Sequence, residues 1–276
     1  MRSNNVLGFI FAATLDDKIP ELASSRTTAS VPIGGKYRII DFDLSNMSNS
    51  GISNVGIVAK SNFQSLMDHV GSGSAYDLSK RRSNLSILPP YDGKAFSSFV
   101  ETIYNMHGYI EHCREEYVLI SQGNVITNID YTDVFDFHSK KKADITLIYK
   151  KHAIPQGYDR PITLDVDNDG KVNQIFVKPG VVDKGVFNHA YGSILIKKDL
   201  LMSEIRNAIS VNQLDVRRLI QSSLGKYSIY AYENKGYCAA ISSINDYFEF
   251  NMDRARQSTP AKLGAFDVLA VRDYKA

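Results

Sequence analysis

The hydrophobic pattern is clearest between residues 39 and 58. Apolar side chains recur there at the spacing of one helical face, at Ile39, Ile40, Leu44 and Met47. Asn49-Ser50-Gly51 follows, and Gly51 suits the left-handed conformation that ends many helices. Residues 55–58 are then a short apolar run between polar residues, as expected of a strand buried in a parallel sheet. The pattern predicts a helix followed by a buried strand.

Similar patterns extend along the chain. Apolar runs predict strands at 6–13, 85–91, 117–120, 143–151 and 227–232. Helical spacing predicts helices at 101–111 and 200–209. Two further strands, 162–166 and 172–177, flank the turn sequence Asp167-Asn168-Asp169-Gly170 and predict a hairpin. Strands that alternate with helices indicate an α/β fold.

Composition narrows the class of protein. The chain has 276 residues, 43% of them hydrophobic, which is enough for one large α/β domain or two small ones. A formal net charge of +2 argues against nucleic acid as the main partner. No apolar run reaches the length of a membrane span, and the first residues lack the pattern of a signal peptide. Cys113 and Cys238 suggest reduced thiols rather than a disulfide framework, so we expect a cytoplasmic protein.

A glycine-rich stretch near residue 35 carries the strongest motif, Pro32-Ile33-Gly34-Gly35-Lys36-Tyr37-Arg38-Ile39-Ile40-Asp41, followed by Leu44-Ser45-Asn46 and Asn49-Ser50-Gly51-Ile52. It closely resembles P-F-G-G-K-Y-R-[IL]-I-D-x-x-L-S-N-x-x-N-S-G-I, the signature of the sugar-nucleotide pyrophosphorylases and, among them, of the bacterial glucose-1-phosphate adenylyltransferase family. The resemblance covers 1–253. It implies a Rossmann-like nucleotidyltransferase domain with a mostly parallel central sheet, inserted hairpins and a closing helix at 241–252.

The resemblance also implies how the chain continues after that domain. Full-length family members carry a C-terminal β-helix domain that mediates assembly. Residues 254–276 are too few to form it, so we expect them to be the start of a link to a β-helix that is absent here.

The chain departs from the family at the positions that carry the chemistry. Catalytic members have G-G-x-G-T-R-L after the first strand, whereas this chain has Ala13-Thr14-Leu15-Asp16-Asp17-Lys18, without the glycines that let backbone N–H groups approach a phosphate. Thr28 stands where the family has a catalytic lysine. Asn124 and Ala240 stand where the family has the two aspartates that hold Mg²⁺, and neither supplies a carboxylate. We therefore expect no catalytic residue and no cofactor, with Mg²⁺ bound only if the chain were active.

Positions that bind ligands in the family are better kept. Lys178 matches a lysine that grips the sugar phosphate, and Gly192 lies in the strand that lines the sugar pocket. Arg26 and Arg38 match arginines near which family members bind sugar-phosphate or nucleotide effectors. The alternative is that both arginines are surface ion-pair partners.

Three more polar residues invite a catalytic or metal-binding role. His69 lies in Ser65-Leu66-Met67-Asp68-His69-Val70-Gly71-Ser72-Gly73, which resembles the regulatory, non-catalytic branch of the family. A single histidine beside apolar residues is more often structural. Asp130 and Asp133 could be metal ligands, but near a predicted helix start they are better explained as caps.

These observations favour a catalytically impaired regulatory subunit of glucose-1-phosphate adenylyltransferase, which acts in bacterial glycogen synthesis with a catalytic partner subunit. One alternative is an active enzyme that makes ADP-glucose and pyrophosphate from ATP and glucose 1-phosphate. Another is a binding module that senses a sugar phosphate. A sugar-phosphate or nucleotide effector is expected, and neither nucleic acid nor a membrane is expected as a partner.

Overall fold

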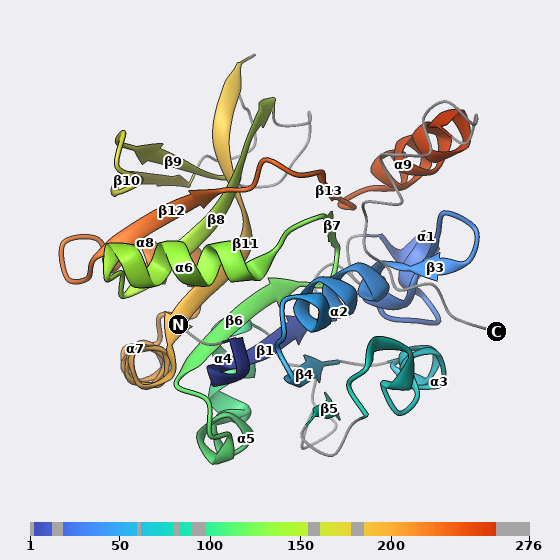
Figure 1. The fold of residues 1–276 in the computed structure, drawn as a ribbon, viewed down its shortest axis with the longest axis horizontal. Helices are drawn as coiled ribbons and strands as arrows, with labels where there is room; N and C mark the ends of the chain where they lie inside the picture. Colours follow the sequence, from blue (N-terminus) through green and yellow to red (C-terminus); the bar gives the residue numbers. More distant parts are fainter. Residues whose placement is uncertain are drawn as a thin grey trace. The chain divides into compact units, whose positions relative to one another are not determined.

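A computed structural model describes residues 3–12, 19–59, 62–79, 83–89, 98–153, 161–177 and 185–257 (Figure 1). The chain divides into two compact units whose segments alternate along the sequence. Unit 1 consists of Met1–Leu7, Tyr91–Ile120 and Thr132–Lys235, and unit 2 of Gly8–Pro90, Ser121–Tyr131 and Gly236–Ala276. The predicted extent of the family domain, 1–253, stays a prediction.

Unit 2 contains a sheet, its helices and two short two-stranded pairs. Its helices are α1 (Pro20–Ala23), α2 (Ile39–Asn49), α3 (Gln64–Val70) and α9 (Ile244–Gln257), with the 3-10 turns η2 (Thr28–Ser30) and η3 (Ser74–Tyr76). Its strands are β2 (Pro32–Ile33), β3 (Tyr37–Arg38), β4 (Asn54–Val58), β5 (Asn84–Leu88), β7 (Val125–Thr127) and β13 (Cys238–Ala240). The strands β1 (Val6–Phe11) and β6 (Tyr117–Gln122) and the helix α6 (Tyr131–Lys141) each continue along the chain from one unit into the other.

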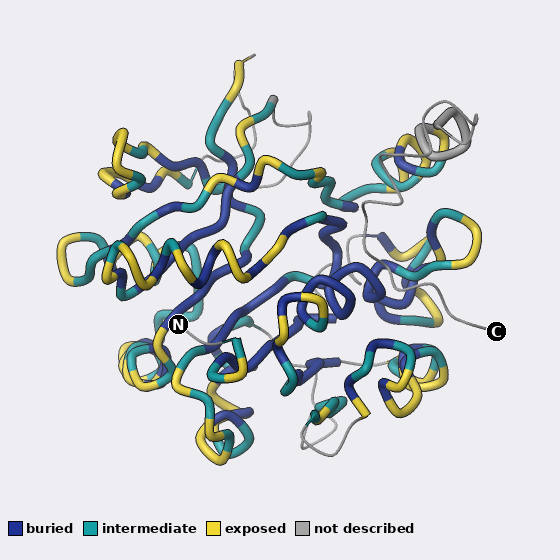
Figure 2. Tube along the Cα trace, viewed as in Figure 1, coloured by how far each residue is buried: buried dark blue, intermediate teal, exposed yellow. Residues whose placement is uncertain are grey.

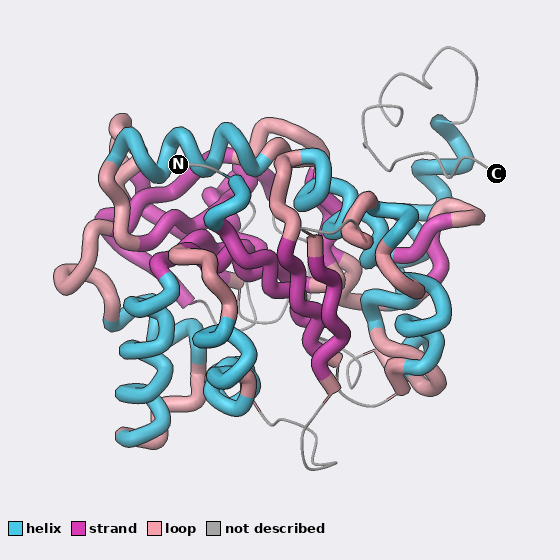
Figure 3. Tube along the Cα trace, turned by 60° about the horizontal axis from the view of Figure 1, so that its bottom comes forward, coloured by secondary structure: helices cyan, strands magenta, loops and turns pink. Residues whose placement is uncertain are grey.

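The core of unit 2 forms around β1 and α2. Every residue of β1 is buried, and α2 is buried from Ile39 to Met47 (Figure 2). β4 pairs in parallel with β5, side by side in the turned view of Figure 3. The predicted helix and strand at 39–58 are confirmed, and Gly51 has the expected positive φ of 78°.

Unit 1 is built on antiparallel pairing around one long strand. Its strands are β8 (Ile145–Ala153), β9 (Ile162–Val166), β10 (Val172–Val177), β11 (Val186–Lys197) and β12 (Ile229–Glu233). Its helices are α4 (Phe99–Asn105), α5 (His107–His112), α7 (Lys198–Ser210) and α8 (Val216–Ser222), and η1 (Ser3–Asn5) lies at its start. β11 pairs antiparallel with β6, β8 and β9, while β12 pairs in parallel with β8.

The predicted hairpin is confirmed with its predicted boundaries. β9 and β10 pair antiparallel with Val166 opposite Val172. Asp167 Oδ1 accepts hydrogen bonds from the backbone N–H groups of Asp169 and Lys171, at 2.9 and 2.8 Å. Gly170 has a φ of 84°, which a residue with a Cβ adopts only with strain.

Some predicted elements differ in their bounds, as in the closing helix, which was predicted at 241–252 and is found at Ile244–Gln257. The helix predicted at 101–111 begins earlier, at Phe99, and is divided at Met106, where φ is −91° and ψ is 7°. The Met106 N–H bonds to the carbonyl oxygens of Thr102 and Ile103, both at 3.1 Å. This shared bond is typical of the end of a helix, so α4 ends there and α5 begins anew.

The fold is mixed α/β, as predicted. In the part of the chain that the structure describes, no helix combines the length and apolar composition needed to cross a membrane.

Candidate functional site

The two positions that match the family's metal ligands lie together in unit 2. β7 and β13 pair antiparallel, with Ala240 opposite Val125. The pairing continues past the strand ends, because the Ile241 N–H donates to the Asn124 carbonyl oxygen at 2.8 Å. Asn124 and Ala240 are therefore neighbours in space, although more than a hundred residues separate them in the sequence.

The chemistry of this pair does not fit Mg²⁺. The Asn124 side chain is buried, with a residue exposure of 4%, and its Nδ2 donates to the Ile241 carbonyl oxygen at 3.3 Å. The amide is thus used to connect the two strands, and the methyl group of Ala240 offers no ligand atom. Mg²⁺ sites in proteins rely on carboxylates. Within the described ranges no group of three or more His, Cys, Asp or Glu side chains could hold a metal ion.

Gly123 packs tightly beside this pair. Its N–H donates to the Phe11 carbonyl oxygen at 2.8 Å, at the end of β1. A Cβ added at Gly123 would lie 2.7 Å from that oxygen and 3.0 Å from both the Ala12 Cα and the Ala29 Cβ. Only glycine allows the end of β6, the end of β1 and η2 to approach this closely.

Thr28 is fully buried at the start of η2. The next residue, Ala29, donates its N–H to the Ala12 carbonyl oxygen at 3.0 Å, so η2 is held beside the residue that follows β1. Because Thr28 has no exposure to water, the charged end of a lysine at this position would have to extend out of a fully buried site to be solvated. The phosphate-loop residues, including Asp16, Asp17 and Lys18, lie outside the described residues.

Of the two predicted sugar-phosphate residues, the structure describes one. Gly192 lies within β11 and has a φ of 89°. The pairing of β11 with β8 shifts register between Ala190 and Ile194, which is a bulge centred on this glycine. Lys178 lies outside the described residues.

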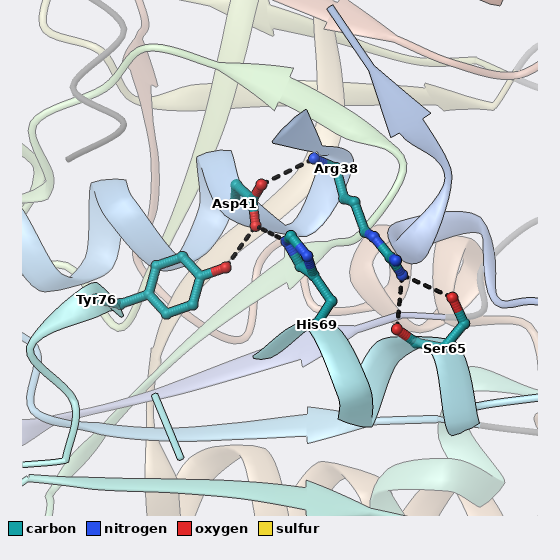
Figure 4. A network of polar contacts seen from close by, with 5 residues as sticks. All are labelled: Arg38, Asp41, Ser65, His69 and Tyr76. Carbon is teal, nitrogen blue, oxygen red and sulfur yellow. Dashed lines mark hydrogen bonds and ion pairs between the residues drawn. The ribbon is translucent and has the colours of Figure 1, made fainter. Parts of the chain in front are cut away.

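Arg38 begins α2 within a buried polar network (Figure 4). The fully buried Asp41 accepts the backbone N–H of Arg38 through Oδ2 at 2.8 Å. Its other oxygen, Oδ1, accepts the Tyr76 hydroxyl at 2.5 Å and lies 2.6 Å from His69 Nε2. One carboxylate thus ties the start of α2 to α3 and η3, and His69 is part of that connection.

The Arg38 side chain reaches the first turn of α3. Its Nη1 donates to the carbonyl oxygen and to Oγ of Ser65, both at 2.6 Å. Among the described residues no acidic side chain forms an ion pair with the Arg38 guanidinium, and the ion-pair interpretation of Arg38 stays an alternative. Ser65 Oγ faces Arg38 and, in the described part of the chain, makes no hydrogen bond to His69, so these residues are not a Ser-His-Asp triad.

Arg26 lies in the loop before η2 and is partly exposed. Two residues earlier, the Ser24 carbonyl oxygen accepts Asn62 Nδ2 at 3.1 Å. The chain near Arg26 and the side chain of Arg38 therefore both contact the short segment 62–65.

The sequence did not indicate a second buried polar group, which involves Asp43. Ser121 Oγ donates to Asp43 Oδ1 at 2.6 Å. Asp43 Oδ2 and the Tyr131 hydroxyl are buried without a hydrogen-bond partner among the described residues. Burial raises the pKa of the Asp43 carboxyl to about 7, against the opposing effect of the Ser121 hydrogen bond. The sequence does contain a signal for this buried carboxyl: Asp43 lies one helical turn from the apolar residues Ile39, Ile40 and Met47, and so on the predicted buried face of the helix.

Asp130 and Asp133 lie where the capping interpretation expects them. Asp130 immediately precedes α6, and Asp133 lies in its first turn. The Tyr131 N–H at the start of α6 donates to Ser50 Oγ at 2.9 Å, and Ser50 Oγ lies 3.4 Å from Asp130 Oδ1. In the part of the chain that the structure describes, neither residue belongs to a cluster of potential metal ligands.

Comparisons with known proteins agree on the family. A family model described as nucleotidyl transferase matches residues 17–252. A glucose-1-phosphate adenylyltransferase of Clostridium acetobutylicum is 31% identical over 263 residues, covering 92% of this chain and 68% of that protein. One of Bacillus subtilis is 30% identical over 271 residues, covering 93% and 69%.

A solved structure shows the same fold. It is described as a glucose-1-phosphate thymidylyltransferase from Bacillus anthracis in complex with a sucrose, and it matches with a TM-score of 0.72 at 12% identity. The match covers 90% of this chain and 95% of that one, which confirms the Rossmann-like nucleotidyltransferase fold with its largely parallel central sheet. Together these findings place the chain in the nucleotidyl transferase family and, within it, among the glucose-1-phosphate adenylyltransferases.

Proposed function

We propose that this chain is a catalytically impaired regulatory subunit of glucose-1-phosphate adenylyltransferase, which acts in bacterial glycogen synthesis with a catalytic subunit. The observation that carries the proposal is the state of the Asn124–Ala240 pair. The pairing of β7 with β13 brings the two positions together, but the buried amide of Asn124 donates to the Ile241 carbonyl oxygen. A scaffold kept without its charged groups fits a subunit selected for assembly and regulation rather than for turnover.

The physical argument concerns charge. Nucleotidyl transfer develops negative charge on a leaving pyrophosphate, which an enzyme must neutralise. Neither Asn124 nor Ala240 contributes a charge or a carboxylate for this purpose. Losing such stabilisation would lower the rate by on the order of 10³-fold or more.

The effector role rests on Arg26 and Arg38. Among the described residues the hydrogen bonds of the Arg38 guanidinium to Ser65 all use Nη1, and in this part of the chain the Nε and Nη2 donors can turn to an anion. A sugar phosphate or a nucleotide presents the phosphate oxygens that such donors bind in pairs. Because Arg38 and the loop of Arg26 both contact residues 62–65, we propose that one anionic effector engages both.

The sugar-phosphate role rests on Lys178 and Gly192. The bulge at Gly192 keeps the backbone shape that only a glycine takes without strain. We propose that sugar-phosphate binding outlasts nucleotide binding in this chain. Calorimetry with glucose 1-phosphate and with ATP tests this, and tight binding of ATP without binding of the sugar phosphate would contradict it.

The main experiment compares the isolated chain with the chain co-expressed with a catalytic homologue. We expect the isolated chain to form no measurable ADP-glucose, to co-purify with the homologue and to change the concentration of effector that half-activates it. Arg26→Ala and Arg38→Lys should weaken that effect, whereas Arg206→Ala, which removes an exposed arginine paired with Glu111, should not. Turnover by the isolated chain at the rate of the homologue would refute the proposal. Sugar-phosphate binding without co-purification would favour the sensing module instead.

Repair of the metal positions tests the structural argument directly. The double change Asn124→Asp and Ala240→Asp rebuilds two carboxylates but removes the Nδ2 donor, so a carboxylate would face the Ile241 carbonyl oxygen. We expect a less stable protein with little or no activity, since groups that act as one catalytic unit are not additive. Adding glycines and an arginine across 13–18, with Thr28→Lys, should raise activity further. Near-normal rates from the pair alone would show that the remaining sites are intact.

A further inference from the structure

Two histidines and a tyrosine meet on one face of the sheet in unit 1. In the pairing of β11 with β8, Phe187 lies opposite His152 and His189 lies opposite Lys150. Residues two apart on a strand point to the same face, so His152 and His189 are diagonal neighbours on that face. Tyr191 follows two residues after His189, and the centroids of these two rings are 4.4 Å apart. We call His152, His189 and Tyr191 the His-Tyr cluster.

The polar atoms of the cluster converge on one nitrogen. His152 Nε2 lies 3.2 Å from His189 Nδ1 and 2.5 Å from the Tyr191 hydroxyl oxygen. A neutral imidazole nitrogen carries either one hydrogen or one lone pair, so it cannot serve two neighbours fully. A cation among the three atoms could be bound by all of them, because each can offer a lone pair.

The spacing of the two nitrogens is close to that of ligands on a tetrahedral ion. Nitrogens bound at about 2.0–2.1 Å to tetrahedral Zn²⁺ lie ~3.3–3.4 Å apart, whereas right-angled ligands at the same bond length lie ~2.9 Å apart. The observed 3.2 Å is nearer the tetrahedral value. The phenol oxygen lies closer to His152 Nε2 than a second ligand would, and has to move back by ~0.8 Å when an ion binds.

The surroundings also suit a transition metal. His189 is fully buried, whereas His152 and Tyr191 are partly exposed, so the cluster lies at the boundary between the core and solvent. Imidazole nitrogens bind zinc and its neighbours in the first transition row, while Mg²⁺ and Ca²⁺ are held by several oxygen ligands. The donor set of the cluster therefore selects against the ion that the family's aspartates hold.

We propose that His152 Nε2, His189 Nδ1 and the deprotonated Tyr191 oxygen bind one tetrahedral transition-metal ion such as Zn²⁺, which joins β8 to β11 beside the bulge at Gly192. Binding releases the phenol proton to solvent, and three protein ligands leave a fourth position for water or an anion. The site uses neither Asn124 nor Ala240 and does not depend on the proposed function.

Titration of the metal-free full chain with Zn²⁺, and in parallel with Mg²⁺, tests the site. We expect about one Zn²⁺ per chain, no comparable binding of Mg²⁺, and release of about one proton per Zn²⁺, measured by calorimetry in buffers that differ in ionisation enthalpy. Because an ion that binds the folded state stabilises it, Tm should rise with the concentration of Zn²⁺.

Variants of the cluster assign the ion to it. His152→Gln, at a partly exposed position, should weaken Zn²⁺ binding ~100-fold or more, and Tyr191→Phe, which removes only a hydroxyl group, should weaken it ~10-fold or more. The matched control, His107→Gln with His112→Gln, removes two exposed histidines of α5 and should leave the affinity unchanged. Circular dichroism without metal establishes that each variant is folded.

Two results would overturn the proposal. One is the absence of Zn²⁺ binding to the unchanged chain, or equal binding by the chain and both cluster variants, which would leave the cluster as a hydrogen-bonded group. The other is binding that is lost in the α5 control and kept in His152→Gln, which would assign the ion to the surface beside Cys113.

Discussion

The buried carboxyl of Asp43 should make the protein less stable as pH rises. Burial raises the pKa of Asp43 from 3.8 to about 7, so the folded chain holds a proton that the unfolded chain releases. Where the folded state binds more protons, the free energy of unfolding falls as pH increases. The stability that the protonated Asp43 carboxyl contributes is fully present below about pH 4 and is lost as pH rises through about 7. The difference in pKa corresponds to about 4 kcal/mol.

Asp43→Asn isolates this contribution, because asparagine keeps an oxygen that can accept the Ser121 hydroxyl but does not ionise. The two proteins should have similar free energies of unfolding near pH 4, and at pH 8 the variant should be more stable by up to about 4 kcal/mol. Only the difference between the proteins matters, since other groups also titrate in this range. Asp136→Asn, on an exposed position of α6, is the control and should change stability by less than about 0.5 kcal/mol at every pH.

Urea unfolding at pH 4, 5.5, 7 and 8 provides the measurement. The chain has no tryptophan but 16 tyrosines, so tyrosine fluorescence can be compared with far-UV circular dichroism. Coincident transitions are required before free energies are compared, because the chain has two units. A difference between parent and Asp43→Asn that stays constant from pH 4 to pH 8 would refute the reasoning. A variant less stable than the parent at pH 8 would do the same.

Two further predictions concern close packing and a buried histidine. Gly123→Ala should destabilise the protein by about 1–3 kcal/mol, because the added Cβ would meet the Phe11 carbonyl oxygen. Gly108→Ala, in α5 with open space around it, should stabilise the protein by about 0.5–1 kcal/mol. Thermal unfolding of both variants tests this, and equal shifts in Tm would contradict it. Burial lowers the pKa of His138 to about 4, and its Nδ1 lies 2.8 Å from Thr146 Oγ1, so the stability that it contributes is present above pH 6.5 and is lost as pH falls through 4. His138→Gln should therefore reduce the loss of unfolding free energy between pH 7 and pH 4 by up to about 3 kcal/mol in urea titrations, and an unchanged loss would count against the assignment.

Local patterns predicted most of the fold. The hairpin of β9 and β10 was predictable because its turn residues and alternating strands lie within one short stretch. Helix α2 and its end at Gly51 were predictable for the same reason. The division of 101–111 was not, because the apolar spacing of Ile103, Met106 and Ile110 continues through the residue where the backbone hydrogen bonding changes.

The candidate site could be predicted only in part. The matches at Asn124 and Ala240 came from resemblance, and the structure adds that the two positions are neighbours through β7 and β13. The donation from Asn124 Nδ2 to Ile241 could not be foreseen, since it depends on the pairing of distant strands. The surroundings of Asp43 escaped prediction because burial of a polar residue is decided by what packs against its helix.

The interleaved segments of unit 2 have a consequence for folding on the ribosome. β7 pairs with β13, and Asn124 bonds to a residue 117 positions later. At about 5–20 residues per second, synthesis leaves the edge of β7 unpaired for roughly 6–23 seconds. During this interval the growing chain presents Val125, Ile126 and Thr127 as an open strand edge, a surface that chaperones and other chains can capture. Efficient production of this protein should therefore depend on how quickly translation proceeds from residue 128 to residue 240, a stretch that contains most of unit 1.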